Sequence, residues 1–378
     1  MVIWEKGRVL QILEEEPHIQ WLTVREERSG ERKKAVHYPG FFGGLDPGDQ
    51  VWLNTTAVRL QLGTGGVHFV AGRIGKDPAP APVKGHMMKL RYTPWQVALP
   101  TGEEPGSPWH QTLQKKRSLE QTPVCIGELH SMLPIAATVW RSLSEDQYPR
   151  VVYVMTDGGA LPAPFSRHVR RLTSLGWLAG TITCGHAFGG DMEAVNLYSA
   201  LLLARHALNA DLIFVSMGPG IAGTGTPYGF SGVEQGQAIN AVHSLQGIPV
   251  AVPRIQGKDV RERHQGISHH TETVLCSVAL APAIIPLPSR LPEPIQDQVK
   301  QLKRNCLTTH HWVEVSITDQ KVEEWLNAYP ETIQTMGRKW KEDPLFFRTI
   351  SVSAYLTFQL WRGIQNGRSV DRAIHEGL

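Results

Sequence analysis

Short runs in which apolar and polar residues alternate, separated by turn residues, occupy the first part of the chain. This period of two is typical of strands that bury one face. The expected strands are Arg8 to Leu13, His18 to Arg25, Arg32 to His37, Gln50 to Asn54 and Val67 to Ala71. Ser29-Gly30 and Asp46-Pro47-Gly48-Asp49 are typical turn sequences between them. We therefore expect a small β-barrel-like domain, of the OB or SH3 kind, over residues 1–75.

From Arg150 onward, the pattern changes to short apolar runs that alternate with helical spacing. The expected strands are Val151 to Met155, Leu178 to Cys184, Leu212 to Met217 and Pro249 to Pro253. The expected helices are Phe165 to Leu175, Asp191 to Leu208, and one that begins with the capping box Ser231 to Glu234. Buried-type strands joined through helices predict an α/β fold, a parallel sheet with flanking helices in Rossmann-like or flavodoxin-like layers. We expect this ligand-binding core over residues 150–290.

The remaining segments have weaker patterns. Lys76-Asp77-Pro78-Ala79-Pro80-Ala81-Pro82 cannot join a sheet interior and is the expected domain boundary. Residues 76–149 are expected to be a linker and intermediate segment, with a helix from Gly127 to Leu143 that is kinked at Pro134 or begins there. Residues 291–378 have helical spacing, and we expect these helices to pack on the core or to mediate self-association as a homo-oligomer.

Composition and charge narrow the class of protein. A chain of 378 residues is expected to hold more than one hydrophobic core. The formal net charge of +3 is too small to favour a nucleic-acid or anionic-membrane partner. No apolar stretch approaches the roughly 20 residues that span a bilayer, and the N-terminus lacks the pattern of a signal peptide. Four widely spaced cysteines favour a reducing compartment. We expect a cytoplasmic protein without a membrane partner.

Large aromatic residues on the first β segments leave one alternative open. Trp4, Trp21, Trp52 and Phe69, together with the basic Arg32-Lys33-Lys34, are compatible with a nucleic-acid-binding barrel. We expect instead that the aromatic side chains fill the barrel and that the basic cluster is a solvated edge that discourages strand pairing.

Ligands of open parallel sheets bind at the carboxyl ends of the strands, so the loops there are the places where functional residues are expected. The loop after the third strand of the core is rich in glycine. Its glycines have dinucleotide-type spacing, but the next helix begins eight residues later, at Ser231, which argues against a nicotinamide or flavin site. We expect this loop to bind a phosphate or carboxylate instead. The alternative is that its glycines only permit tight turns or close packing. The candidates are Gly218, Gly220, Gly223, Thr224, Gly225 and Thr226.

Ionisable residues follow the first two strands of the core. Asp157, followed by Gly158 and Gly159 as candidate ligand-binding positions, can accept a proton or coordinate a cation; its alternative role is to cap the turn. His186 can titrate near neutral pH and is a catalytic candidate.

Two more residues near the second strand have alternative roles. Asp191 is a metal-ligand candidate or a helix N-cap. Cys184 is either a nucleophile paired with His186 or a packed core residue.

Three histidines and two arginines lie close together after the fourth strand. Such residues can hold a divalent metal or clamp an anion, although the spacing matches no zinc signature. Because adjacent histidines point in different directions in a regular element, only one of His269 and His270 is expected to be a direct ligand. We assign His264 and His270 to a metal site with Asp191, His269 to catalysis, and Arg261 and Arg263 to anion binding. A solvated polar loop is the alternative.

If the sheet assembles as expected, these loops meet at one edge. Asp157, His186 and His269 would then supply acid/base chemistry beside backbone amides that can bind an anion. The leading hypothesis is a hydrolase or transferase acting on a small polar or phosphorylated metabolite, with a divalent metal as candidate cofactor. The alternative is a non-catalytic small-ligand sensor, or an interaction module that uses the N-terminal β domain.

Several short sequence segments of the chain resemble a bacterial family catalogued as domain of unknown function 3866. They are Leu53 to Val58, Leu62 to Gly66, Met155 to Pro162, Gly185 to Asp191, Gly218 to Gly225 and Ser268 to Thr271. They extend over most of the chain up to about Pro288. The resemblance implies a bacterial, cytoplasmic context and supplies no activity or catalytic residues.

Overall fold

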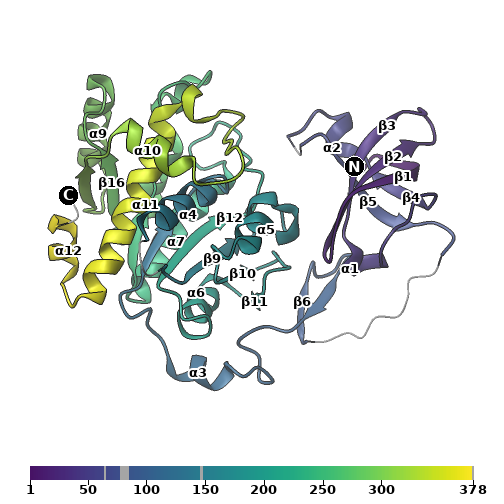
Figure 1. Ribbon diagram of the computed structural model, residues 1–378, viewed down its shortest axis with the longest axis horizontal. Coiled ribbons are helices and arrows are strands. Elements are labelled where there is room, and N and C mark those ends of the chain that lie inside the picture. Colours follow the sequence, from purple (N-terminus) through teal and green to yellow (C-terminus); the bar gives the residue numbers. More distant parts are fainter. Residues whose placement is uncertain (64, 77–84, 145–147, 377–378) are drawn as a thin grey trace. The chain divides into compact units, whose positions relative to one another are not determined.

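The computed structural model describes residues 1–63, 65–76, 85–144 and 148–376 (Figure 1). The chain divides into two compact units, one of residues 1–84 and 90–98, the other of residues 85–89 and 99–378. Most of the expected domain boundary, residues 77–82, lies outside the described residues. Among the described helices, none combines the length and the apolar character needed to cross a bilayer.

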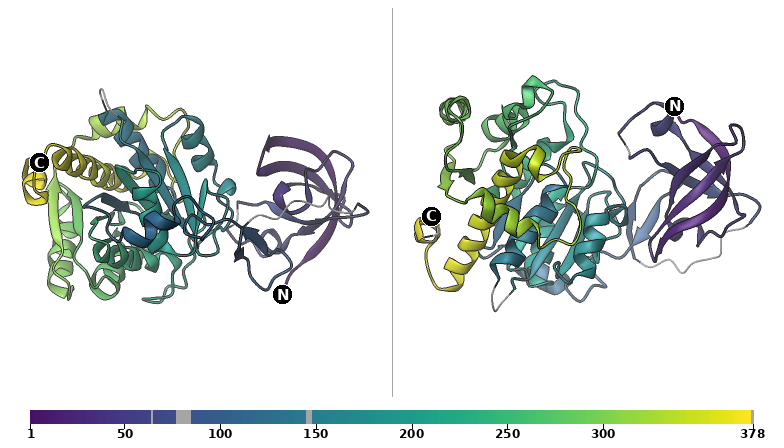
Figure 2. Two further views of the ribbon diagram at one scale, coloured as in Figure 1. Left: turned by 90° about the horizontal axis from the view of Figure 1, so that it is seen from below. Right: turned by 45° about the horizontal axis from the view of Figure 1, so that its top comes forward.

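The first unit is a closed five-stranded barrel, which confirms the expected β-barrel-like domain (Figure 2). Its strands are β1 (Trp4–Glu16), β2 (Ile19–Glu26), β3 (Arg32–His37), β4 (Gln50–Asn54) and β5 (His68–Arg73). They close in the order β1-β2-β3-β5-β4, with β3 and β5 parallel and the other neighbouring strands antiparallel. Two short helices, α1 (Pro39–Phe42) and α2 (Thr56–Arg59), connect strands of the barrel.

Aliphatic side chains fill this barrel. The buried cluster consists of Val9, Leu22, Val24, Ala35, Leu45, Val51, Leu53 and Val70. The expectation that the aromatic residues fill the barrel is wrong for Trp4 and Trp52, whose side chains are 39% and 41% exposed. The strand alternation explains this result, because the buried neighbours of Trp52 on β4 are Val51 and Leu53 and successive residues face opposite sides.

The second unit is built on an eight-stranded parallel sheet, which confirms the expected α/β fold class. Its strands are β8 (Pro123–Ile126), β9 (Val151–Thr156), β10 (Gly180–Cys184), β11 (Met192–Ala194), β12 (Leu212–Met217), β13 (Ile248–Ala251), β16 (Ile284–Pro288) and β17 (His311–Val315). Their order is β11-β10-β9-β12-β8-β13-β16-β17. The sheet therefore also contains strands from outside residues 150–290, because β8 precedes this segment in the chain and β17 follows it.

Helices cover both faces of this sheet (Figure 1). One face packs against α4 (Met132–Leu143), α5 (Arg167–Ser174), α10 (Asp319–Leu326) and the long α11 (Pro344–Gln365). The other packs against α6 (Leu197–His206), α7 (Glu234–Ser244) and α9 (Glu293–Asn305). Tyr153 and Met155 belong to the first core and Val152 and Val154 to the second, as the period of two in a strand requires.

The shorter elements complete the second unit. They are β6 (Met87–Lys89), β7 (Val97–Leu99), α3 (His110–Lys115), β14 (Ile255–Gln256), β15 (Gly266–Ile267), α8 (His269–Thr273) and α12 (Val370–Glu376), with β7 straddling the boundary between the units. Helix α8 continues as a π-helical turn, Val274–Val278.

Two expected helix starts are wrong. The capping box at Ser231 does not form, because α7 begins at Glu234 and the Glu234 carboxylate accepts a hydrogen bond from Thr156 instead. Helix α6 begins at Leu197, capped by the Asn196 side chain, rather than at Asp191. The segment after Asp191 forms the edge strand β11, because parallel pairing with β10 satisfies its backbone. Pro134 lies in the first turn of α4, so it marks the start of that helix.

The cysteines have two different environments. Cys125 and Cys184 are free and buried. Cys276 and Cys306 form a disulfide, which their separation of 30 residues did not suggest. This disulfide joins the π-helical turn after α8 to the end of α9.

Candidate functional site

The chain reverses its direction across the sheet at β8 and β12. From β8 it moves to β9 and β10 on one side, whereas from β12 it passes to β13, β16 and β17 on the other. Ligands of open parallel sheets bind at such a switch point, beyond the carboxyl ends of the strands. Glu128 follows β8, the glycine-rich loop 218–230 follows β12, and Arg254 follows β13. These three segments define the candidate site.

Three buried ionisable side chains form one part of this site. Glu128, Arg254 and His270 are 1%, 1% and 5% exposed. Oε1 of Glu128 lies 2.5 Å from Nδ1 of His270 and 3.3 Å from Nη1 of Arg254. Burial opposes ionisation of Glu128, but the contacts with His270 and Arg254 outweigh it and lower the pKa of this carboxyl. Glu128 is therefore an anion that accepts hydrogen bonds from both neighbours.

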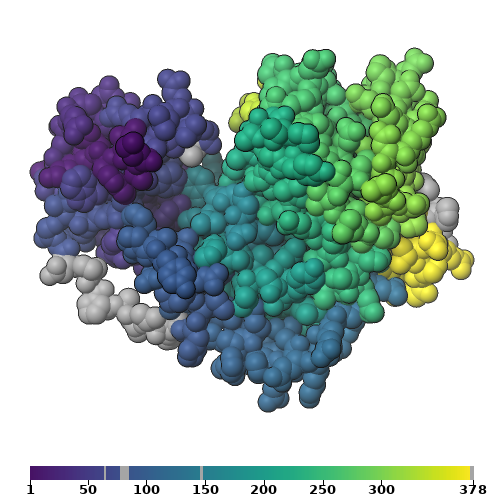
Figure 3. All heavy atoms as spheres, turned by 180° about the vertical axis from the view of Figure 1, so that it is seen from behind, coloured from purple at the N-terminus to yellow at the C-terminus, as the bar shows by residue number. Residues whose placement is uncertain are grey.

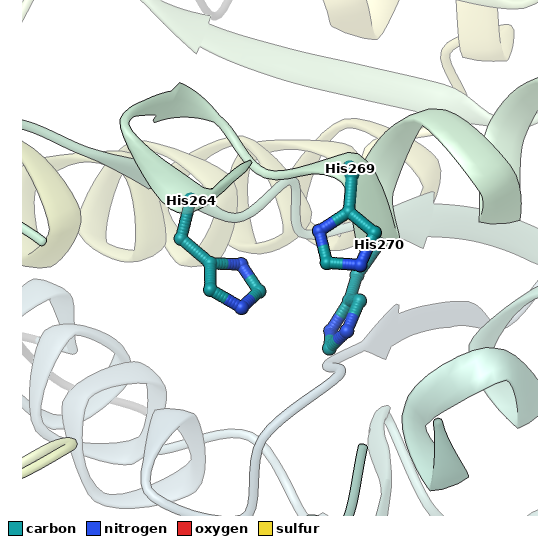
Figure 4. Close-up of side chains that lie close together, drawn as sticks. All are labelled: His264, His269 and His270. Carbon is teal, nitrogen blue, oxygen red and sulfur yellow. The ribbon is translucent and has the colours of Figure 1, made fainter. Parts of the chain in front are cut away.

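His270 also belongs to a cluster of three histidines whose side chains lie close together (Figure 4). One ring nitrogen of each of His264, His269 and His270 lies within 4.8 Å of those of the other two. The ring centroids are 4.3 to 4.9 Å apart. His264 precedes β15, whereas His269 and His270 are the first residues of α8. The adjacent pair thus comes together, contrary to the expectation that His269 and His270 diverge, because both lie where the chain enters a helix.

The Nδ1 atom of each imidazole already has a partner. Nδ1 of His270 contacts the Glu128 carboxylate, and Nδ1 of His269 lies 3.2 Å from the carbonyl oxygen of Arg263. Nδ1 of His264 lies 2.7 Å from Oγ of Ser268. A carboxylate and a carbonyl can only accept, so they fix the Nδ1–H tautomer of His270 and His269, and the Ser268 oxygen can accept as well. This arrangement leaves the Nε2 lone pairs as the free ligand atoms.

Burial keeps two of these rings neutral. It lowers the pKa of His264 to about 3, helped by the nearby Arg254 and Arg261. Burial also lowers the pKa of His269. Nε2 of His269 and Oε2 of Glu128 are buried and have no hydrogen-bond partner among the described residues. Because buried polar atoms are normally paired, two unsatisfied atoms in one place indicate that a further group belongs there.

The glycine-rich loop lies over the histidines. The Phe230 ring stacks on His270 at 3.7 Å with an interplanar angle of 2°. A Cβ atom on Gly223 would lie 3.8 Å from Nε2 of His270, so the loop faces the free nitrogen with bare backbone. A Cβ on Gly225 would lie 3.7 Å from the Arg263 guanidinium. The predicted loop and the predicted histidine segment therefore come together.

Several loop residues have structural explanations. A side chain on Gly159 would collide with the carbonyl of Gly218, and one on Gly218 with that of Ala160, so these glycines let two loops cross. The Thr224 and Thr226 hydroxyls bond to each other at 3.0 Å, and the Thr224 hydroxyl also donates to the Gly229 carbonyl. The threonines thus stabilise a small hairpin of the loop. Gly220 has a φ of 101°, a conformation that favours glycine.

A pair of carboxylates, Asp157 and Glu234, lies beside β9. Oδ2 of Asp157 accepts the backbone N–H of His186 at 2.9 Å, which brings the two predicted residues together. Glu234 contacts the Thr156 hydroxyl and packs against Gly158. Burial, together with the negative charge of the neighbouring Asp157, raises the pKa of Glu234 to about 7. Glu234 was not predicted as a functional residue, because its position suggested only a helix cap.

Glu234 should make stability depend on pH. Its carboxyl binds protons more tightly when folded than at the ordinary pKa of 4.5, so its contribution is complete below pH 4.5 and is lost as the pH rises through about 7. Between pH 4.5 and 8, the free energy of unfolding of the wild type should therefore fall by up to about 3 kcal/mol relative to that of Glu234→Gln. Urea unfolding at both pH values measures this difference. The exposed Glu293→Gln is the matched control; equal behaviour of the two variants would contradict the prediction.

Three other predicted residues do not take the roles expected of them. Oδ2 of Asp191 accepts from the backbone and hydroxyl of Thr181, on β10, which is four strands from β13. Strands are about 4.8 Å apart, so Asp191 does not join His264 and His270. Arg261 pairs with Asp259 through Nε at 3.0 Å and is held there. Burial raises the pKa of the Cys184 thiol to about 12, which does not suit a nucleophile.

Comparison with known proteins identifies the family. Residues 34–354 match the family described as "Protein of unknown function (DUF3866)". The chain belongs to this family. No curated protein matches the chain at a significant level.

The DUF3866 segment contains every residue of the candidate site, from Glu128 to His270, and also β4, β5 and the last four residues of β3 in the barrel. Strands β1 and β2 precede the matched residues. Sequence reasoning missed Glu128 and Arg254, the two buried charges of the site. Their signal was available only in part: each follows a short apolar run of the chain, but the four residues of β8 were not recognised as a strand.

Proposed function

We propose that this protein is a metal-dependent hydrolase acting on a small polar or phosphorylated metabolite. His264, His269 and His270 would hold one zinc ion through Nε2. The observation that carries the proposal is the convergence of three imidazoles whose Nδ1 atoms are each occupied by a partner. Metal-bound histidines characteristically use the second ring nitrogen in this way, with a carboxylate or carbonyl as acceptor.

The donor set fits zinc. Imidazole nitrogens suit this ion, and three protein ligands with one open position are typical of catalytic rather than structural sites. Zn–N bonds of about 2.0–2.1 Å place tetrahedral nitrogens about 3.3 Å apart, so zinc would draw together three imidazoles whose converging ring nitrogens lie within 4.8 Å of one another. A zinc ion here would supply a water of lowered pKa and polarise a substrate oxygen.

The surrounding residues support hydrolysis of an anionic or polar substrate. Glu128 orients His270 and balances the positive charge of the site. The bare backbone at Gly223 leaves room next to Nε2 of His270. The exposed Arg263, beside Gly225, is placed to attract a carboxylate or phosphate.

Metal analysis and a substrate screen test the proposal. The purified full-length chain should contain about one zinc ion, measured by elemental analysis, and lose it on dialysis against a chelator. It should hydrolyse members of a panel of phosphoesters, esters and amides, and zinc should restore the activity of the chelated protein. A chain that neither retains nor takes up zinc would refute the metal site. Zinc binding without turnover on any class would refute the hydrolase and favour a metal-dependent sensor.

A further inference from the structure

The outer surface of the barrel carries an open aromatic groove. It has a volume of about 390 Å³ and is lined by Trp4, Trp52, Ala71 and Trp95. The Trp4 and Trp95 rings lie 6.4 Å apart, and Nε1 of Trp95 donates to the carbonyl of Ala71 at 3.4 Å. Figure 3 shows the first residues of the chain, in the darkest purple, at the surface of the barrel. Three indole rings that do not fill the core therefore form a surface on which flat groups can stack.

A row of arginines crosses the same outer surface. Arg8 on β1 pairs in register with Arg25 on β2, and Arg25 pairs with Arg32 on β3. All three are exposed, and none forms an ion pair with another described residue. Opposite Arg8 on β4 lies Gln50, which contacts Glu27 at 3.5 Å. Like charges directly opposite each other destabilise a sheet, so this row is better explained by an anion that it binds than by the barrel's own stability.

The groove and the row adjoin. Trp52 lies two residues after Gln50 on β4, so both face outward and their Cα atoms are about 7 Å apart. Lys6, directly opposite Trp52, places its ammonium 5.2 Å from the centroid of the Trp52 ring. A cation already occupies the position that a cationic ligand would take, which argues against a quaternary ammonium or methylated lysine. The ligand should therefore combine flat rings with negative charge.

We propose that the barrel binds single-stranded nucleic acid. Bases would stack on Trp4, Trp52 and Trp95, and phosphates would run along Arg8, Arg25 and Arg32. Stacking platforms next to a basic track are the two elements of such binding, and stacking tolerates any base. The small net charge of the whole chain did not indicate this basic row, because the arginines align only when the strands pair. The proposal is independent of the metal site.

Fluorescence titration of the full-length chain with 12-nucleotide single-stranded DNA and RNA, at several salt concentrations, tests the proposal. Trp52→Ala should weaken binding by about 5- to 100-fold, because each stacked base contributes about that factor. The triple variant Arg8→Gln, Arg25→Gln, Arg32→Gln should make the slope of log affinity against log salt less negative by about 2. The matched control is the triple variant of exposed arginines in the second unit, Arg117→Gln, Arg290→Gln, Arg304→Gln.

Three results would overturn the proposal. The first is no binding of either oligonucleotide at 50 mM salt. The second is equal affinity for a duplex or for heparin, which would indicate attraction of any polyanion without base stacking. The third is that a polyproline peptide quenches the tryptophan fluorescence of the groove whereas the oligonucleotides do not. A preference for DNA or for RNA identifies the natural strand and supports the proposal either way.

Discussion

Replacing His270 with alanine should leave the purified protein without stoichiometric zinc and reduce hydrolysis by more than about 100-fold. Loss of an outer partner of a metal ligand already costs about 10- to 100-fold, and His270 is proposed as a direct ligand. His264→Ala should have the same effect, because three ligands cannot be reduced to two without losing the ion. Elemental analysis and the visible spectrum of the cobalt-substituted protein measure the loss.

The control for these variants is His311→Ala, which removes an exposed imidazole on β17. It should retain both zinc and activity. The zinc content and activity of Glu128→Gln should lie between those of His270→Ala and His311→Ala, since an amide oxygen still accepts from Nδ1 of His270 but carries no charge. Normal zinc content in His264→Ala and His270→Ala would show that the histidines are not the ligands.

Glu128→Ala should destabilise the second unit by about 3–5 kcal/mol. The substitution leaves the Arg254 guanidinium buried at 1% exposure without its main counter-charge, and an unpaired buried charge has an effect of this size. Urea unfolding followed by circular dichroism measures it. The experiment is run with chelator present, so that loss of metal does not contribute to the difference.

A double variant separates lost charge balance from lost packing. Glu128→Leu combined with Arg254→Met removes both charges, and replacing a whole buried pair by apolar residues is often neutral or stabilising. The double variant should therefore recover most of the stability lost in Glu128→Ala. The exposed Glu293→Ala should change stability by less than about 0.5 kcal/mol. A double variant as unstable as the single one would show that the pair does not act through its charges.

The sequence predicted the elements whose signal is local. The strands Arg32–His37, Gln50–Asn54 and Leu212–Met217 were placed with their observed bounds, because turn residues flank each apolar or alternating run. Strand β8 was missed, because four residues that begin with a proline give no periodic signal. Its own residues Val124 and Ile126 belong to one core and Cys125 to the other, a pattern that becomes visible only in the assembled sheet.

The candidate site was predicted in part for the same reason. His264, His269 and His270 lie within seven positions, so their cluster was visible in the sequence. Their partner Glu128 lies 142 positions before His270, and only the order of the strands brings the two together. Asp191 shows a different error: it was assigned to a metal site with His264 and His270, but its carboxylate bonds to Thr181 on β10, in the other half of the sheet.

The order of the strands also bears on how this chain folds as it leaves the ribosome. Strand β8 is synthesised first, yet both of its neighbours, β12 and β13, come later, and Met217 follows Ile126 by 91 positions. Chains are synthesised at about 5–20 residues per second, so both edges of β8 stay unpaired for about 5 to 18 s before β12 is complete. Nascent chains that end before Leu212 should therefore depend on chaperones, whereas the barrel, whose strands pair over short separations, can close before the sheet begins to assemble.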